Sequence, residues 1–134
     1  MLKLSNQEID LKEVSPLALA FLGDSVFDIL VRNWLVLNNK LPVGRLNEIK
    51  VSYVCCQSQA LIMQKIMDSL TEEELSIYKR GRNAKVSSVP KNASVSQYHS
   101  ATGFEALMGY IYLKGDTERL EQIFDLCLDV YKNL

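Results

Sequence analysis

The stretch LALAFLGDSVFDIL, residues 17–30, decides the fold class, because apolar residues cover nearly every side of the helix it would form. Asp24 interrupts this stretch, and Glu105 stands in similar surroundings in ATGFEALMGYIYL, residues 101–113. An ionised carboxylate in an apolar interior is costly unless a partner or a cation compensates its charge. No Lys or Arg stands one helical turn from either acid. Each acid is therefore either a structural residue satisfied by backbone or hydroxyl groups, or a ligand of a divalent metal.

The two acidic stretches are far apart in the chain, so a shared metal would require their helices to pack side by side. Small residues in both stretches would permit a close approach of the two backbones; they are Gly23, Ala101, Gly103, Ala106 and Gly109. A metal held by both acids would suit hydrolysis of a phosphodiester, since it would activate a water and stabilise charge on the phosphate.

Helical signals continue along the rest of the chain, and strand signals are weak. Ser15-Pro16 is typical of a helix start, and Thr71–Glu74 has the pattern of a capping box. A Ser- and Asn-rich loop is expected over residues 85–97. The predicted helices cover residues 17–37, 44–70 (one long helix, or two with a break near 52–55), 72–83, 98–113 and 117–132. The class is all-α, the first helix is expected to be buried on all sides, and residues 1–134 are expected to form one domain.

Composition excludes several other classes of protein. The longest apolar candidate, residues 17–37, contains Asp24, Asp28 and Arg32, so no membrane span is expected. The segment MLKLSNQEIDLKE is mixed and charged, which does not fit a signal peptide. Three cysteines are present, two of them adjacent and none in a CxxC pair, which favours reduced thiols and a cytoplasmic location.

Charge is unevenly distributed along the chain. No Asp or Glu occurs between Leu75 and Phe104, whereas this segment carries five basic residues, Lys79, Arg80, Arg82, Lys85 and Lys91. A basic segment in a chain of net charge −1 indicates a localised site for a polyanion. The alternative is a solvated surface with no ligand.

Three motifs together resemble the ribonuclease III family. FLGDSV resembles the core of that family's signature, which reads like ERLEFLGDAV, and FEALMGYIYL resembles its second acidic motif, which reads like DxxEALIGAIYL. Between them, GRLNEIKVSYV is similar to the family's GxLxxxRxxLV, with Lys50 at the basic position. The resemblance covers about residues 15–134 and implies a helical endonuclease domain that forms a homodimer.

The resemblance also implies an activity and a set of site residues. Such enzymes cleave double-stranded RNA with Mg²⁺, for which Mn²⁺ is a possible substitute, and leave 5′-phosphate and 3′-hydroxyl ends. Asp24 and Glu105 would be the catalytic residues and the metal ligands. Contacts with RNA are expected from the basic segment, and supporting roles near the metal are possible for three further residues. The RNA-contacting candidates are Arg80, Arg82, Asn83, Lys85 and Lys91, and the supporting candidates are Asp28, Lys50 and Thr102.

The chain departs from the family pattern at three acidic positions, which are Leu17, Ala20 and Thr102 here. No double-stranded-RNA-binding domain is expected after the second motif. This combination, with YKRGRNAK and YHSATGFEA, resembles the family's lone-domain Mini-III branch, which implies maturation of large-subunit (23S) ribosomal RNA precursors. The lost acids leave a rival open: a non-catalytic module that binds RNA or a ribosomal assembly. A plain helical interaction protein is a second rival.

Overall fold

The computed structural model describes residues 10–86, 88–91 and 93–133, and every regular element within these residues is helical. Residues 1–9, with most of the charged N-terminal segment, and the loop residues Ser87 and Asn92 lie outside the described part. The all-α prediction is confirmed. The elements in chain order are η1 (Leu11–Glu13), α1 (Pro16–Asn38), α2 (Val43–Val54), α3 (Cys56–Ile66), η2 (Met67–Ser69), α4 (Glu72–Arg82), α5 (Val95–Lys114) and α6 (Thr117–Lys132), where η marks a 3₁₀ turn.

Capping side chains set most of the helix starts. The Ser15 hydroxyl accepts from the Ala18 amide at 3.1 Å, and the capping box predicted for Thr71 and Glu74 is present. α5 begins at Val95, three residues before the predicted start at Tyr98. The reason is a cap overlooked in the loop: the Ser94 side chain accepts from the Gln97 amide at 3.0 Å.

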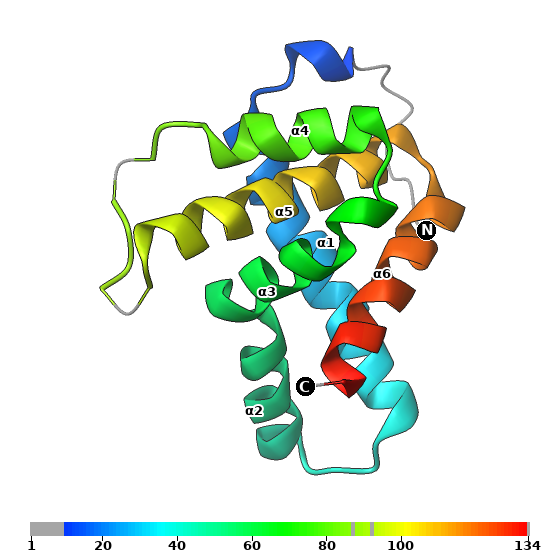
Figure 1. Cartoon of the computed structure of the whole chain (residues 1–134). Coiled ribbons are helices and arrows are strands. Elements are labelled where there is room, and N and C mark those ends of the chain that lie inside the picture. Colours follow the sequence, from blue (N-terminus) through cyan, green and yellow to red (C-terminus); the bar gives the residue numbers. More distant parts are fainter. Residues whose placement is uncertain (1–9, 87, 92, 134) are drawn as a thin grey trace.

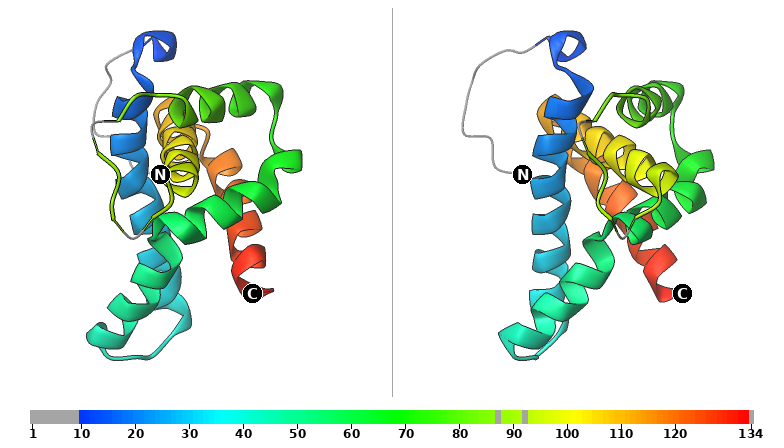
Figure 2. Two further views of the ribbon diagram at one scale, coloured as in Figure 1. Left: turned by 60° about the vertical axis from the view of Figure 1, so that its left-hand side comes forward. Right: turned by 90° about the vertical axis from the view of Figure 1, so that its left-hand side faces the viewer.

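The segment predicted as one or two helices over residues 44–70 forms two helices that meet at Cys55. Cys55 has an extended backbone (φ −66°, ψ 157°), so it ends α2 and also precedes the first residue of α3. This break turns the chain. The C-terminal end of α1 and the helix α2 form a hairpin that projects from the rest of the molecule (Figure 2).

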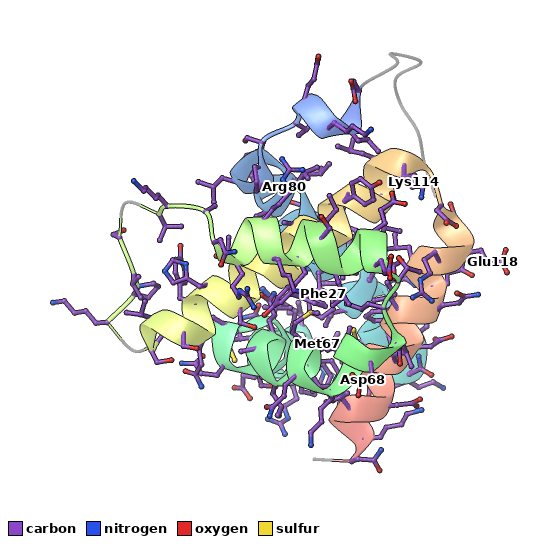
Figure 3. All side chains as sticks on the ribbon, turned by 45° about the horizontal axis from the view of Figure 1, so that its top comes forward. Phe27, Met67, Asp68, Arg80, Lys114 and Glu118 are labelled. Carbon is purple, nitrogen blue, oxygen red and sulfur yellow. The ribbon has the colours of Figure 1, made fainter. Side chains whose placement is uncertain are left out.

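α5 is the central element, and α1, α3, α4 and α6 all contact it (Figure 1). Phe27 of α1 lies in the middle of the molecule (Figure 3), where its ring meets Phe104 of α5 edge-on with centroids 5.0 Å apart. Phe124 of α6 lies on another side of the Phe27 ring, at 6.2 Å. Because α5 is covered on several sides, ten of the eleven residues from Ala101 to Ile111 are buried, and Glu105 alone in this stretch is partly exposed.

Glycines bring α1 and α5 into backbone contact. A Cβ on Gly23 would lie 1.7 Å from the Glu105 carbonyl oxygen, and one on Gly109 would lie 2.0 Å from the Leu19 carbonyl oxygen. The predicted close approach is therefore present at these two residues. Gly103 was expected to serve the same crossing, but it faces α4, where an added Cβ would lie 2.6 Å from the Tyr78 carbonyl oxygen. α5 therefore uses Gly109 for its close contact with α1 and Gly103 for its close contact with α4.

The expectation that the first helix is buried on all sides was wrong. One side of α1 packs on the core through Leu19, Phe27 and Val31, while Phe21 is 84% exposed and Leu37 is 74% exposed. An apolar sequence around the whole helix thus covers both a core side and an open apolar side. Among the described residues, no helix combines the length and apolarity that crossing a membrane requires.

Candidate functional site

The crossing of α1 and α5 brings Asp24 and Glu105 together. Asp24 follows the contact glycine Gly23, and Glu105 supplies the carbonyl oxygen that Gly23 faces. Their side chains are within hydrogen-bonding distance of each other. Asp24 is exposed and Glu105 is half-buried. The expectation that both acids lie in the interior is therefore corrected for Asp24, which lies at the edge of the contact and faces solvent.

The surroundings of Glu105 favour its protonated form. Burial is the largest cause, and the hydrogen bond with Asp24 and the Asp24 charge add to it, so that the pKa of Glu105 rises to about 9. A hydrogen bond with Gln59 acts in the opposite direction. No Lys, Arg or His forms a salt bridge with either acid among the described residues. Two carboxyl groups in contact with no basic partner do not both ionise readily, so the pair holds a proton unless a cation binds.

This donor set fits a hard divalent cation such as Mg²⁺. Oxygen ligands suit Mg²⁺, which usually keeps several waters and needs only one or two carboxylates from the protein. Within the described residues no group of three or more His, Cys, Asp or Glu side chains surrounds a metal position. Asp24 and Glu105 are the two acids that meet here, and the exposure of Asp24 leaves room for water and other oxygen ligands.

The N-terminal turn of α3 borders the acid pair. Gln59, which sequence analysis missed, is 2% exposed and forms a hydrogen bond with Glu105. Cys56 lies close enough to Glu105 to interact with its charge; burial first, then the charges of Cys55 and Glu105, raises the pKa of the Cys56 thiol. A signal for Gln59 was present in the sequence. Its helical spacing places it on the same helix face as Ile62, Met63 and Ile66, and a polar residue on this otherwise apolar face is unusual.

The three supporting candidates lie in different surroundings. Asp28 is one helical turn after Asp24, but its carboxylate pairs with Arg32 Nε at 2.6 Å and with Lys50 Nζ at 3.5 Å. Lys50 therefore joins α2 to α1 next to the site. The Thr102 hydroxyl donates to the Tyr98 carbonyl oxygen at 2.9 Å, so its hydrogen bond lies within α5.

The basic candidates lie at the end of α4 and in the loop that follows it, which extends away from the helices (Figure 1). Gly81 of α4 contacts α5 at Gly103 and Ala106, on either side of Glu105, so this basic segment begins beside the helix that carries Glu105. Lys85 and Lys91 are exposed in the loop. Arg82 is half-buried: its guanidinium lies 5.5 Å from the centroid of the Tyr78 ring.

The outer side of α4 carries an open hollow of about 550 Å³. It is lined by Glu72, Leu75, Ser76, Lys79, Arg80 and Asn83. Arg80 and Asn83 thus share one surface, and Lys79 joins them, although it was not among the predicted RNA-contacting residues. The helical spacing of residues 76, 79, 80 and 83 was a signal that could have included Lys79.

Comparisons with known proteins place the chain in a family. The family model described as "Ribonuclease III domain" matches residues 17–116. Mini-ribonuclease 3 of Thermoanaerobacter is 44% identical over 131 residues, covering 95% of this chain and 92% of the relative, and Mini-ribonuclease 3 of Clostridium tetani is 40% identical over 124 residues, covering 92% and 82%. A crystal structure of a protein from Fusobacterium nucleatum superposes with a TM-score of 0.82 at 31% identity and covers 95% of this chain and 100% of that protein. The chain therefore belongs to the ribonuclease III family, in its Mini-ribonuclease 3 branch.

Proposed function

We propose that this family nuclease is a Mg²⁺-dependent endoribonuclease that cleaves double-stranded RNA. The observation that carries the proposal is the contact between Asp24 and Glu105, two acids from distant parts of the chain with no basic partner among the described residues. A pair of this kind is unfavourable in the protein alone and becomes favourable when a divalent cation binds.

The two acids would have different parts in the reaction. Half-buried Glu105 would hold the inner side of the metal, and exposed Asp24 would hold the side that a phosphodiester approaches. When bound, Mg²⁺ supplies a water activated for attack on phosphorus and neutralises charge that develops on the phosphate. Attack that expels the 3′-oxygen leaves 5′-phosphate and 3′-hydroxyl ends.

The RNA would be bound by a basic surface, which consists of Lys79, Arg80, Arg82, Asn83, Lys85 and Lys91. Lys and Arg contacts with phosphate give affinity that depends on salt and hardly on sequence. Duplex RNA is recognised mainly through its shape, phosphates and 2′-hydroxyls, which suits such a surface. Gly81 packs against Gly103 and Ala106, so α4 and its basic residues are held against the helix that carries Glu105.

A homodimer is supported by the open apolar side of α1. Leu17 is 38% exposed and Phe21 is 84% exposed, and Asp24 follows Phe21 on the same side of the helix. A large exposed aromatic residue one turn from the site indicates a protein contact. In a twofold dimer through this side, the two acid pairs would lie on one face of the assembly and each could cut one strand.

The proposed substrate is a duplex in precursor 23S ribosomal RNA, and the proposed location is the cytoplasm. Support comes from the similarity to Mini-ribonuclease 3 of several bacteria, over most of each chain. All three cysteines are free thiols, which fits a reducing compartment.

The test is cleavage of a long duplex RNA and of a matched single strand, with Mg²⁺ or with EDTA, by wild type and by Asp24→Asn. We expect cuts in the duplex only, with Mg²⁺ only, and with 5′-phosphate ends; Asp24→Asn should bind the duplex but not cut it. Duplex binding by wild type without cleavage would support the non-catalytic rival.

Gel filtration of Phe21→Glu tests the dimer. The control is Val95→Glu, the same kind of change at an exposed apolar residue elsewhere.

A further inference from the structure

Gln59 is a buried polar residue for which the fold itself gives no use. It lies near the start of α3, is 2% exposed, and shares its helix face with the core residues Ile62, Met63 and Ile66. A side-chain amide that is buried among apolar residues costs free energy unless its donors and acceptors are satisfied. An apolar residue at this position would continue the stripe, so the amide calls for a specific explanation.

The partner of Gln59 is the carboxyl group of Glu105 on α5. An ionised carboxylate only accepts hydrogen bonds, so the amide nitrogen of Gln59 must be the donor when Glu105 is charged. The contact joins α3 to α5 at the point where α5 also crosses α1. Glu105 therefore lies between two side chains, with Gln59 on one side and Asp24 on the other.

We propose that Gln59 is a positioning residue that holds the Glu105 carboxylate in the orientation in which it shares a divalent cation with Asp24. This inference rests on the proposed metal-dependent function. Hydrogen bonds to a ligating carboxylate fix its rotamer, so the metal meets a preorganised ligand. One oxygen of Glu105 would accept from Gln59, and the other oxygen would be available to the metal.

The chemistry of glutamine suits this task better than that of the alternatives. A Lys or Arg at position 59 would neutralise Glu105, as Arg119 neutralises Glu74 elsewhere in this protein. It would therefore compete with the metal for the Glu105 carboxylate. A Glu would add a third negative charge. The neutral amide donates a hydrogen bond and leaves the negative charge of the acid pair available for the cation.

The experiment replaces Gln59 by Met, which keeps the length of the side chain and removes the donor. The matched control is Gln64→Met, the same change at an exposed position of the same helix. Mg²⁺ and Mn²⁺ affinities of the free protein are measured by calorimetry, and cleavage rates are measured as a function of Mg²⁺. We expect Gln59→Met to weaken metal binding roughly 10- to 100-fold, to recover much of its rate at high Mg²⁺, and to bind duplex RNA normally in EDTA.

A double-mutant cycle with Glu105→Gln tests whether Gln59 acts through Glu105. Once Glu105 is replaced, Gln59→Met should cause no further loss of metal affinity. Equal metal affinities for wild type and Gln59→Met, or a full additional loss on the Glu105→Gln background, would overturn the inference. If wild type itself binds no divalent metal and cuts no RNA, the proposed function fails, which is a different result.

A measurement on wild type covers the case in which Gln59→Met does not fold. The side-chain amide signals of Gln59 and Gln64 are followed by NMR during a titration with Mg²⁺. We expect the Gln59 signals to shift in proportion to metal bound, while the Gln64 signals stay in place. Gln59 signals that do not respond to bound metal would refute the positioning role.

Discussion

Two glutamates on neighbouring helices, Glu74 and Glu105, have opposite surroundings. Glu74 is 6% exposed, and Arg119 donates to both of its carboxylate oxygens at 2.8 Å. Its Oε1 also accepts from the Thr71 amide at 2.9 Å. Glu105 faces another acid, Asp24, and an uncharged amide, Gln59. The protein supplies the countercharge for one glutamate and withholds it from the other.

The pKa directions express the same contrast. Burial alone would raise the pKa of Glu74, but the hydrogen bonds and charge of Arg119, together with Thr71, outweigh burial and lower it. Burial and then Asp24 raise the pKa of Glu105 to about 9. Glu74 is thus compensated inside the fold, whereas Glu105, the proposed metal ligand, is left without a countercharge at the cost of stability.

The largest expected effect is on the cleavage rate, which replacement of Glu105 should lower and replacement of Glu74 should not. Glu105→Gln should lower the rate of duplex cleavage by more than about 100-fold, since a ligand contributes more than the outer-shell partners whose loss costs roughly 10- to 100-fold. Glu74→Gln should leave the rate per folded molecule nearly unchanged. Both rates are measured at saturating Mg²⁺. Similar losses for the two variants would remove the distinction between them.

Breaking the Glu74–Arg119 pair should have the largest effect on stability. Arg119→Met leaves a buried carboxylate without its partner and should lower the free energy of unfolding by about 3 kcal/mol. Glu105→Gln should instead raise the stability of the metal-free protein, because a neutral amide removes the cost that burial and the Asp24 charge place on an ionisable group. Urea unfolding in EDTA measures both values, and a destabilised Glu105→Gln would contradict the view that the ionisable group at position 105 lowers stability.

Metal should stabilise the protein through the acid pair alone. A cation present at 100 times its Kd stabilises the folded state by about 2.7 kcal/mol, so Mg²⁺ should raise the Tm of wild type and of Glu74→Gln. It should not raise the Tm of Asp24→Asn or Glu105→Gln. Thermal unfolding with Mg²⁺ and with EDTA gives the four differences, and a metal shift that survives in both site variants would place the cation elsewhere.

Taken per pH unit, the smallest effect is a pH dependence of stability that has opposite sign for the two glutamates. The folded pKa of Glu105 lies above its ordinary value of 4.5, so the folded state holds an extra proton and metal-free stability falls as pH rises from about 4.5 to 9. The slope is at most about 1.4 kcal/mol per pH unit. The pKa of Glu74 is lowered, so its contribution is present above pH 4.5 and is lost as pH falls below that value. Urea unfolding of wild type, Glu105→Gln and Glu74→Gln across this pH range should show the first slope flattened only in Glu105→Gln.

Local signals in the sequence predicted the helices well. Ser15-Pro16 and the Thr71–Glu74 capping box mark helix starts because a cap is formed by residues close in sequence. The start of α5 was placed three residues late because Ser94 stands among several serines, and nothing local shows which of them caps. The glycines indicated close helix contacts, but the sequence did not show that Gly109 of α5 contacts α1 whereas Gly103 of α5 contacts α4.

The sequence by itself determined the helical class, the two acidic motifs and the basic segment, because these depend on residue type and short-range spacing. Only the tertiary structure decided that Asp24 and Glu105 touch, that Asp28 pairs with Lys50 of α2 as well as with Arg32 one turn along its own helix, and that Gln59 reaches Glu105. The physical reason is that charge compensation acts across space between helices distant in sequence. Which acid receives a partner is therefore settled by how the helices cross.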